Sequence, residues 1–189
     1  MINYTISYNN PHRHYIDFEL STSTNGKESM RFQLAAWRPG RYELADFAQN
    51  IQKWGAFDEN NKPLPFKKIT KDLWEVETKG SEKITVVYNF YANQLDAGSC
   101  YLDEHQLYLN PVHCMFYIVD RMEEEYQLNM EIPENYQIAS SMKQDGNTLT
   151  VKGYDLLSES PIICSDILQH GTYEVDGITF HLWFQGECK

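Results

Sequence analysis

The sequence lacks the features of a membrane-spanning, secreted or nucleic-acid-binding protein. Its longest apolar run, residues 115–119, is far too short to cross a bilayer. Its first residues show neither the basic nor the apolar segment of a signal peptide, so we expect a cytoplasmic location. Basic residues are dispersed and number 16 against 27 acidic ones. An acidic surface repels phosphate groups, so we expect no nucleic-acid partner and no membrane span.

Signatures of catalysis are absent as well. The chain has no His-Glu-x-x-His, no glycine-rich phosphate loop and no Gly-x-Ser-x-Gly. No two of its six histidines lie four residues apart, which excludes a zinc-binding pair on one helix. The cysteines form no Cys-x-x-Cys pair, and we expect free thiols in a reducing compartment, although their even number also permits disulfides. They are Cys100, Cys114, Cys164 and Cys188.

Aromatic residues and alternating patterns are abundant instead. Aromatics make up 14% of the chain, which favours strands because flat rings pack well on a pleated face. Apolar residues alternate with polar ones over 2–8, 14–20, 30–36, 84–90, 108–118 and 126–132, among other short segments. Asn25-Gly26 and Asp176-Gly177 are strong hairpin turn signals.

These patterns predict about a dozen short strands and at most two short helices, one of them near residues 155–158. No proline-, glycine- or serine-rich linker divides the chain. We therefore predict an all-β fold, an antiparallel β-sandwich or saddle-like sheets with one or two short helices, in a single β-rich domain over residues 1–189.

The stretch from Trp37 to Phe47 is the clearest landmark. Pro39 and Gly40 suit the two central positions of a type II turn, because proline presets φ and glycine accepts a positive φ. After the turn, four apolar residues fall at helical spacing, which predicts a short amphipathic helix. They are Leu44, Phe47, Ala48 and Ile51.

Three groups of residues are candidates for a site. His12 and His14, two apart on a predicted strand, would project from one face and chelate a metal; alternatively, His14 packs at the strand start and His12 caps the Pro11 turn. A second group is either an acid–base cluster or a solvated acidic loop. It comprises Asp96, Asp103, Glu104 and His105.

The third group is aromatic. Four tryptophans either line a sugar- or peptide-binding face or fill a β core. They are Trp37, Trp54, Trp74 and Trp183. The alternative function that they suggest is a free-standing β-sandwich module that binds carbohydrate or peptide, with exposure of at least two tryptophans in one row as its mark.

Four segments together resemble the N-terminal domain of the glycyl aminopeptidase family of metallopeptidases. They are similar to that family's Pro-His-x-His-Tyr entry to the second strand, its Trp-x-Pro-Gly-x-Tyr…Asp-Phe-Ala corner, its Ala-Tyr-Leu-Asp segment and its Tyr-Asp-Glu-Leu-x-Asp-Ser-Pro segment. In this sequence they are residues 10–18, 37–48, 101–103 and 154–162, in the family's order. Three positions depart from the pattern: Arg41 replaces a serine, Ser99-Cys100 replaces Arg-x-Ala, and Glu159 replaces an aspartate.

The resemblance implies a non-catalytic β domain that precedes a thermolysin-like zinc domain. The expected partners are that catalytic domain, in the same polypeptide, and the peptide substrate of the parent enzyme. No cofactor is expected in this chain, because the zinc would belong to the catalytic domain. The resemblance also implies that the loop after Tyr101 approaches the catalytic cleft, and the candidate cleft-lining residues are Tyr101, Asp103, Tyr108 and Asn110, whose alternative role is ordinary turn and strand packing.

Overall fold

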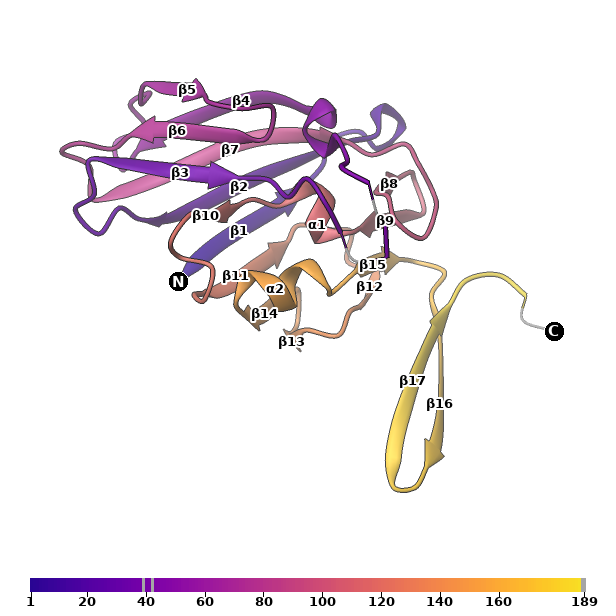
Figure 1. Cartoon of the computed structure of the whole chain (residues 1–189). Helices are drawn as coiled ribbons and strands as arrows, with labels where there is room; N and C mark the ends of the chain where they lie inside the picture. Colours follow the sequence, from indigo (N-terminus) through magenta and orange to yellow (C-terminus); the bar gives the residue numbers. More distant parts are fainter. Residues whose placement is uncertain (39, 42, 188–189) are drawn as a thin grey trace.

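The computed structural model describes residues 1–38, 40–41 and 43–187, and strands dominate it (Figure 1). The first half of the chain forms β1 (Ile2–Ser7), β2 (Tyr15–Ser23), β3 (Ser29–Gln33), β4 (Ile51–Asp58), β5 (Phe66–Lys68), β6 (Leu73–Glu77) and β7 (Lys83–Tyr91). The second half forms β8 (Tyr101–Leu102), β9 (Gln106–Leu109), β10 (Tyr117–Ile118), β11 (Glu125–Met130), β12 (Gln137–Ala139), β13 (Lys143–Asp145), β14 (Thr148–Lys152), β15 (Ile162–Ser165), β16 (Gln169–Val175) and β17 (Ile178–Phe184).

The helical segments are short. They are two 3-10 turns, η1 (Pro11–Arg13) and η2 (Phe47–Asn50), and two α-helices, α1 (Pro111–Cys114) and α2 (Tyr154–Ser158). None of the helices that the structure describes is both long enough and apolar enough to pass through a bilayer. The prediction of an all-β fold with one or two short helices is confirmed.

The strands form three sheets and a separate hairpin. The largest sheet has the order β13-β14-β11-β1-β2-β7-β4 and is antiparallel except where β1 pairs with β11. A second sheet, β10-β3-β6-β5, lies over the β2–β7 side of the first, and a third, β12-β15-β9-β8, lies beyond one end (Figure 1). The hairpin β16–β17 projects away from all three (Figure 1).

Much of the core lies between the seven-stranded sheet and the sheet β10-β3-β6-β5, because alternate side chains of their strands point inward. β1 follows the pattern strictly, with every second residue from Ile2 to Ile6 buried. Phe116 fills the middle, and the rings of Trp74 and Tyr88 meet it edge-on at centroid distances of 5.1 and 4.9 Å.

The corner after β3 is less helical than its sequence predicts. Only Phe47–Asn50 form a 3-10 turn, Ile51 already begins β4, and Leu44 is 81% exposed. Strand pairing competes with helix formation here, because Ile51 lies opposite Phe90 where β4 pairs with β7. Gly40 has the positive φ, 84°, that the predicted turn needs; Pro39 and Tyr42 lie outside the described residues.

Two further predictions need correction. Asn25 and Gly26 both have positive φ, yet β2 and β3 do not pair: β2 pairs with β1 and β7, and β3 with β6 and β10. The predicted strand over 108–118 is interrupted by α1, because Pro111 takes a first-turn position of a helix, where its missing N–H is not needed.

Candidate functional site

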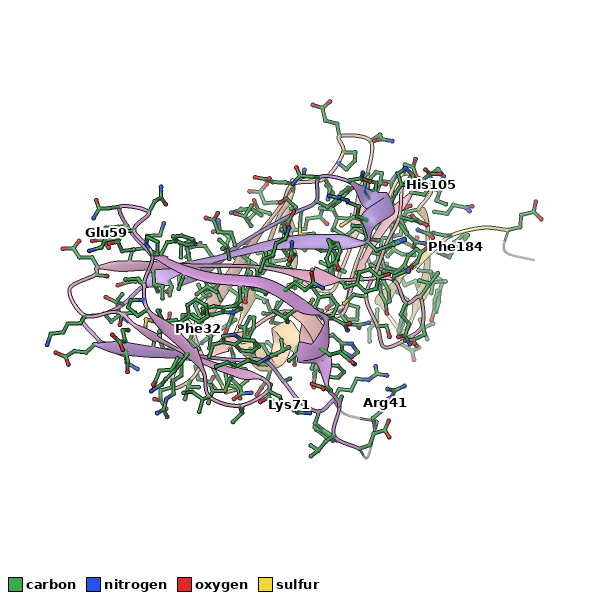
Figure 2. The ribbon with its side chains drawn as sticks, turned by 90° about the horizontal axis from the view of Figure 1, so that it is seen from above. Phe32, Arg41, Glu59, Lys71, His105 and Phe184 are labelled. Carbon is green, nitrogen blue, oxygen red and sulfur yellow. The ribbon has the colours of Figure 1, made fainter. Side chains whose placement is uncertain are left out.

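A cavity of about 340 Å³ opens beside the corner. Its lining comes from Arg41 to Asn50, from Phe90 to Cys100 at the end of β7 and the loop after it, and from His113 on α1. The corner is held in place by Lys71, whose ammonium donates to the carbonyl of Ala45 at 2.8 Å. Figure 2 shows Arg41 and Lys71 on the same margin of the molecule.

His113 is the buried titratable group of this cavity. Its ring stacks on Phe47 with centroids 3.8 Å apart, and the residue is 6% exposed. Burial lowers the pKa of His113 to about 4, helped by the positive charges of Arg38 and Arg41 and opposed by Asp96. The imidazole is therefore neutral at pH 7, and within the described residues its Nε2 has no hydrogen-bond partner.

The loop after β7 is shaped by Asp96. Its carboxylate accepts a hydrogen bond from the Gly98 N–H at 2.7 Å, which is the main reason that its pKa lies below the usual value. The guanidinium of Arg38 lies where a Cβ on Gly98 would be, so a larger residue at this position would have to displace it. Asp96 thus shapes the loop between Gln94 and Ser99, both of which line the cavity.

Three buried tyrosines bind the backbone of residues 114–116, which directly follow His113. Tyr4 of β1 donates to the carbonyl of Phe116 at 3.0 Å and accepts from its N–H at 2.9 Å. Tyr88 of β7 donates to the carbonyl of Cys114 at 2.7 Å, and Tyr154 of α2 donates to that of Met115 at 3.1 Å. These bonds satisfy a backbone segment that belongs to no strand, and they fix α1 and His113 against the sandwich.

The predicted cleft-lining residues lie in the third sheet. Tyr101 pairs with Tyr108 across β8 and β9, so their side chains share one face. Asn110, 6% exposed, donates from Nδ2 to the Tyr108 hydroxyl at 3.0 Å and to the carbonyl of Ser99 at 2.6 Å. Because Ser99 lines the cavity, Asn110 connects this cluster to it.

Asp103 has a different role. Its Oδ1 accepts the N–H groups of His105 and Gln106, both at 2.9 Å, and so closes the turn between β8 and β9. Its charge still helps burial to raise the pKa of Tyr101. None of the four predicted residues lines the cavity itself, and whether they face a substrate cleft stays a prediction.

The acidic cluster is only partly assembled. Glu104 lies 3.5 Å from His105 and 3.6 Å from His12, but all three side chains are more than half exposed, at 58%, 56% and 71%. Asp96 binds the backbone of its own loop instead, by accepting the Gly98 N–H. Ion pairs between exposed side chains such as these are weak because water screens them. The alternative of a solvated acidic loop therefore fits better than an acid–base site.

The metal-chelating arrangement of His12 and His14 is wrong. His12 lies in η1, while His14 has a left-handed φ of 58° and precedes β2, so the two do not project from one strand face. The His14 ring donates from Nδ1 to the carbonyl of Leu102 at 2.6 Å, which ties it to β8. Asn10, rather than His12, caps the Pro11 turn by accepting the His12 N–H.

The donor set for a zinc ion is also missing from the described residues. Over 1–38, 40–41 and 43–187, no three or more histidine, cysteine or carboxylate side chains come together in a way that fits a metal ion. A zinc centre needs three protein ligands, and the described residues do not bring such a set together. Cys100, Cys114 and Cys164 are buried free thiols, as expected; Cys188 is not among the described residues.

Sequence reasoning missed the cavity and His113. The sequence feature that could have revealed His113 is Asn110-Pro111, because proline is common in the first turn of a helix. The helix that begins there, α1, carries His113 on a buried turn. Nothing in the local sequence indicated that this turn would meet Phe47, because the contact joins segments that are far apart in the chain.

The family model described as Peptidase M61 N-terminal domain matches residues 3–166. The chain belongs to this family. It is the family that the four motifs resemble, and the match spans all three sheets of the domain. No curated protein gives a match.

Solved structures agree with the Peptidase M61 N-terminal fold. The chain is similar to an aminopeptidase N family protein from Idiomarina loihiensis, with a TM-score of 0.90 and 26% identity over 99% of this chain and 33% of that one. It is also similar in fold to an M1 zinc metallopeptidase from Deinococcus radiodurans bound to a Tyr-Ser-Ala substrate, with a TM-score of 0.50 and 11% identity over 96% of this chain and 46% of that one. The chain therefore spans about a third to a half of the length of these proteins.

Proposed function

We propose that this chain is the N-terminal accessory domain of a zinc aminopeptidase-like metallopeptidase. In this proposal it packs on a catalytic domain of the same polypeptide, and its segment from Tyr101 to Asn110 shapes one wall of the peptide-binding cleft. The observation that carries the proposal is the family match over residues 3–166. The short span of the chain relative to its structural neighbours supports it as well.

In this proposal the catalytic domain of the same polypeptide carries out the zinc-dependent hydrolysis. Zinc hydrolysis requires three protein ligands and an open position for water. The described residues supply no such set, so the zinc and its ligands are proposed to lie in the catalytic domain. The buried free thiols support a reducing, cytoplasmic compartment for the whole protein.

Exposed apolar side chains support a covered surface around the cavity. Trp37 and Leu44 of the corner and Leu95 of the facing loop are 48%, 81% and 61% exposed. Large apolar side chains are expensive to leave in water, and in a multidomain protein such a surface meets a neighbouring domain. The hydrogen bond from Asn110 to Ser99 would connect the loop on this surface to the pair Tyr101 and Tyr108, so that a shift of one would move the other.

The free-standing binding module is less well supported. Its basis was a row of exposed tryptophans, but Trp54 stacks on Trp74 at 5.8 Å and Trp74 is 3% exposed. The two exposed tryptophans, Trp37 and Trp183, belong to different elements. They share no strand, so no strand of the described residues carries the row of at least two exposed tryptophans that would mark such a module.

The proposal is tested by aminopeptidase assays on the polypeptide that contains this sequence. We expect hydrolysis of aminoacyl anilides by that polypeptide and none by residues 1–189 alone. Tyr108→Phe removes the hydroxyl that accepts from Asn110, and we expect it to raise KM roughly fivefold with a smaller effect on kcat, because it disturbs cleft shape and leaves the chemistry intact.

Tyr117→Phe on β10 is the matched control, since it makes the same change away from the cavity and should leave KM unchanged. Equal effects of the two variants would contradict the cleft-wall role. A reading frame without His-Glu-x-x-His downstream, or hydrolysis by residues 1–189 alone, would contradict the accessory-domain assignment.

A further inference from the structure

The hairpin β16–β17 has one apolar face and one polar face. Register places six apolar side chains on the first face, with Gln169 and Gly171. The six are Tyr173, Val175, Ile178, Phe180, Leu182 and Phe184. The opposite face carries five polar residues and one aromatic residue, Trp183, whose ring stacks on His170. The polar residues are Thr172, Glu174, Thr179 and the histidine pair His170 and His181, whose ring nitrogens lie 2.9 Å apart.

No other part of the described chain covers the apolar face. Tyr173, Phe180 and Leu182 are 48%, 41% and 51% exposed. The two strands contact each other extensively and have no comparable contact with any other named element of the described residues. Figure 1 shows them extending away from the sheets.

Such a hairpin is not stable by itself. Two strands in water are marginal, and a half-apolar pair needs a third strand or a packed layer on its apolar side. Both outer edges also present unpaired backbone groups, which readily accept another strand. The hairpin therefore has the form of an element that completes a larger sheet.

The comparisons point to the same polypeptide as the source of that sheet. The family model ends at residue 166, three residues before β16 begins. The Idiomarina loihiensis structure nevertheless matches 99% of this chain, hairpin region included, while this chain accounts for only 33% of it. The hairpin thus lies beyond the N-terminal domain as the family defines it and within the fold of the larger protein.

We propose that β16–β17 docks into the domain that follows residue 189 in the polypeptide. One of its edges pairs with a strand of that domain, its apolar face covers that domain's core, and its polar face stays in water. The inference rests on the proposed function, because it requires the larger polypeptide. The docking also implies that the domain boundary falls between β15 and β16, and that the hairpin joins the two domains by packing on the second one.

A second copy of this chain is the less favoured occupant. Each copy carries a net charge of −11, so two copies repel, and the hairpin has no lysine or arginine to offset this. Self-association through the apolar face is therefore an outcome that would overturn the proposal.

Hydrogen exchange tests the proposal directly. In residues 1–189 we expect the amides of β16 and β17 to exchange fast while those of β1, β2 and β7 are protected. In the larger polypeptide we expect exchange of the hairpin amides to slow by about 100-fold or more, to the level of the following domain, because the hairpin then opens only with that domain.

Two aspartate variants give the matched comparison. Leu182→Asp places a charge on the apolar face, and we expect it to restore fast hairpin exchange in the larger polypeptide. Thr172→Asp places the same charge on the opposite face of the same hairpin and should leave the protection unchanged. In residues 1–189 alone neither variant should alter the melting temperature, which shows that the variants fold.

The outcomes separate this inference from the proposed function. An active aminopeptidase whose hairpin amides stay unprotected overturns the docking inference and leaves the accessory-domain role standing. A protected hairpin in a polypeptide without peptidase activity does the reverse. A reading frame that closes at residue 189, or dimerisation of residues 1–189 that Leu182→Asp abolishes, overturns the docking inference.

Discussion

Phe18 on β2 and Phe180 on β17 occupy similar places in alternating strands, yet Phe18 is 2% exposed and Phe180 is 41% exposed. The difference extends to polar groups. The hydroxyls of Tyr4, Tyr88 and Tyr154 are buried and bonded to backbone carbonyls, whereas Tyr173 is 48% exposed. The same local pattern therefore gives a cooperative core in the sandwich and an uncovered face in the hairpin, because only the sandwich has a second layer.

The largest test of this contrast compares two phenylalanines. We expect Phe18→Ala to lower the free energy of unfolding of residues 1–189 by about 3–5 kcal/mol, since it leaves a cavity between packed sheets. Phe180→Ala should change it by less than about 0.5 kcal/mol. Urea unfolding measures both, and comparable losses would show that the hairpin belongs to the cooperative unit.

Histidines give a pH-dependent version of the comparison. The folded pKa of His113 is about 4, below the 6.5 of an unfolded histidine, so the unfolded state gains a proton first as pH falls. Stability should therefore be unaffected above pH 6.5 and fall between pH 6.5 and 4, by up to about 3 kcal/mol.

His113→Leu should flatten the pH dependence over that range in thermal or urea unfolding. His181→Leu makes the same change on the exposed hairpin face and should leave the dependence as it is. If both variants keep the wild-type dependence, His113 is not the group responsible.

Tyrosine hydroxyls probe the buried hydrogen bonds. Tyr4→Phe leaves the N–H and carbonyl of Phe116 without their partner in the core, and we expect a loss of about 2 kcal/mol in the free energy of unfolding. Tyr173→Phe in the hairpin is the counterpart and should be neutral. A neutral Tyr4→Phe would mean that residues 114–116 find another way to satisfy their backbone.

The smallest effect concerns Glu124. Arg121, 7% exposed, donates from Nε at 2.6 Å and is the main reason that the pKa of Glu124 lies at about 2. Since this is below the unfolded value of 4.5, the pair stabilises the fold above pH 4.5 and the stabilisation is lost as pH falls toward 2.

Glu124→Gln should lower the free energy of unfolding at pH 7 by about 1 kcal/mol, since water partly screens this carboxylate, and should leave stability at pH 2 nearly unchanged. Glu174→Gln in the hairpin should change neither value. Equal effects of the two substitutions at pH 7 would contradict the specific role of the Arg121 contact.

Much of the fold follows from local patterns. β7 spans Lys83–Tyr91, where the alternation over 84–90 predicts a strand, and α2 forms over Tyr154–Ser158, close to the predicted helical turn. The Asp176-Gly177 turn closes the hairpin β16–β17 as predicted. In these places the residues that set the backbone conformation are neighbours in the sequence.

The site was much less predictable. The predicted residues Tyr108 and Asn110 are hydrogen-bonded to each other. The cavity, however, depends on the contact of His113 with Phe47, which lies 66 residues away in the sequence. Instead of the helix expected after Trp37, the structure has only one 3-10 turn, because Ile51 pairs with β7 as the first residue of β4.

By itself the sequence determined the strand content, the tight turns, the buried alternation and the family, because each depends on residues within one or two turns of backbone or on motifs read in order. Tertiary structure alone decided that Asn25-Gly26 leads from one sheet to another, instead of closing a hairpin as Asp176-Gly177 does. The two signals specify the same local dihedral angles, and which strand lies beyond a turn depends on where distant apolar faces find cover.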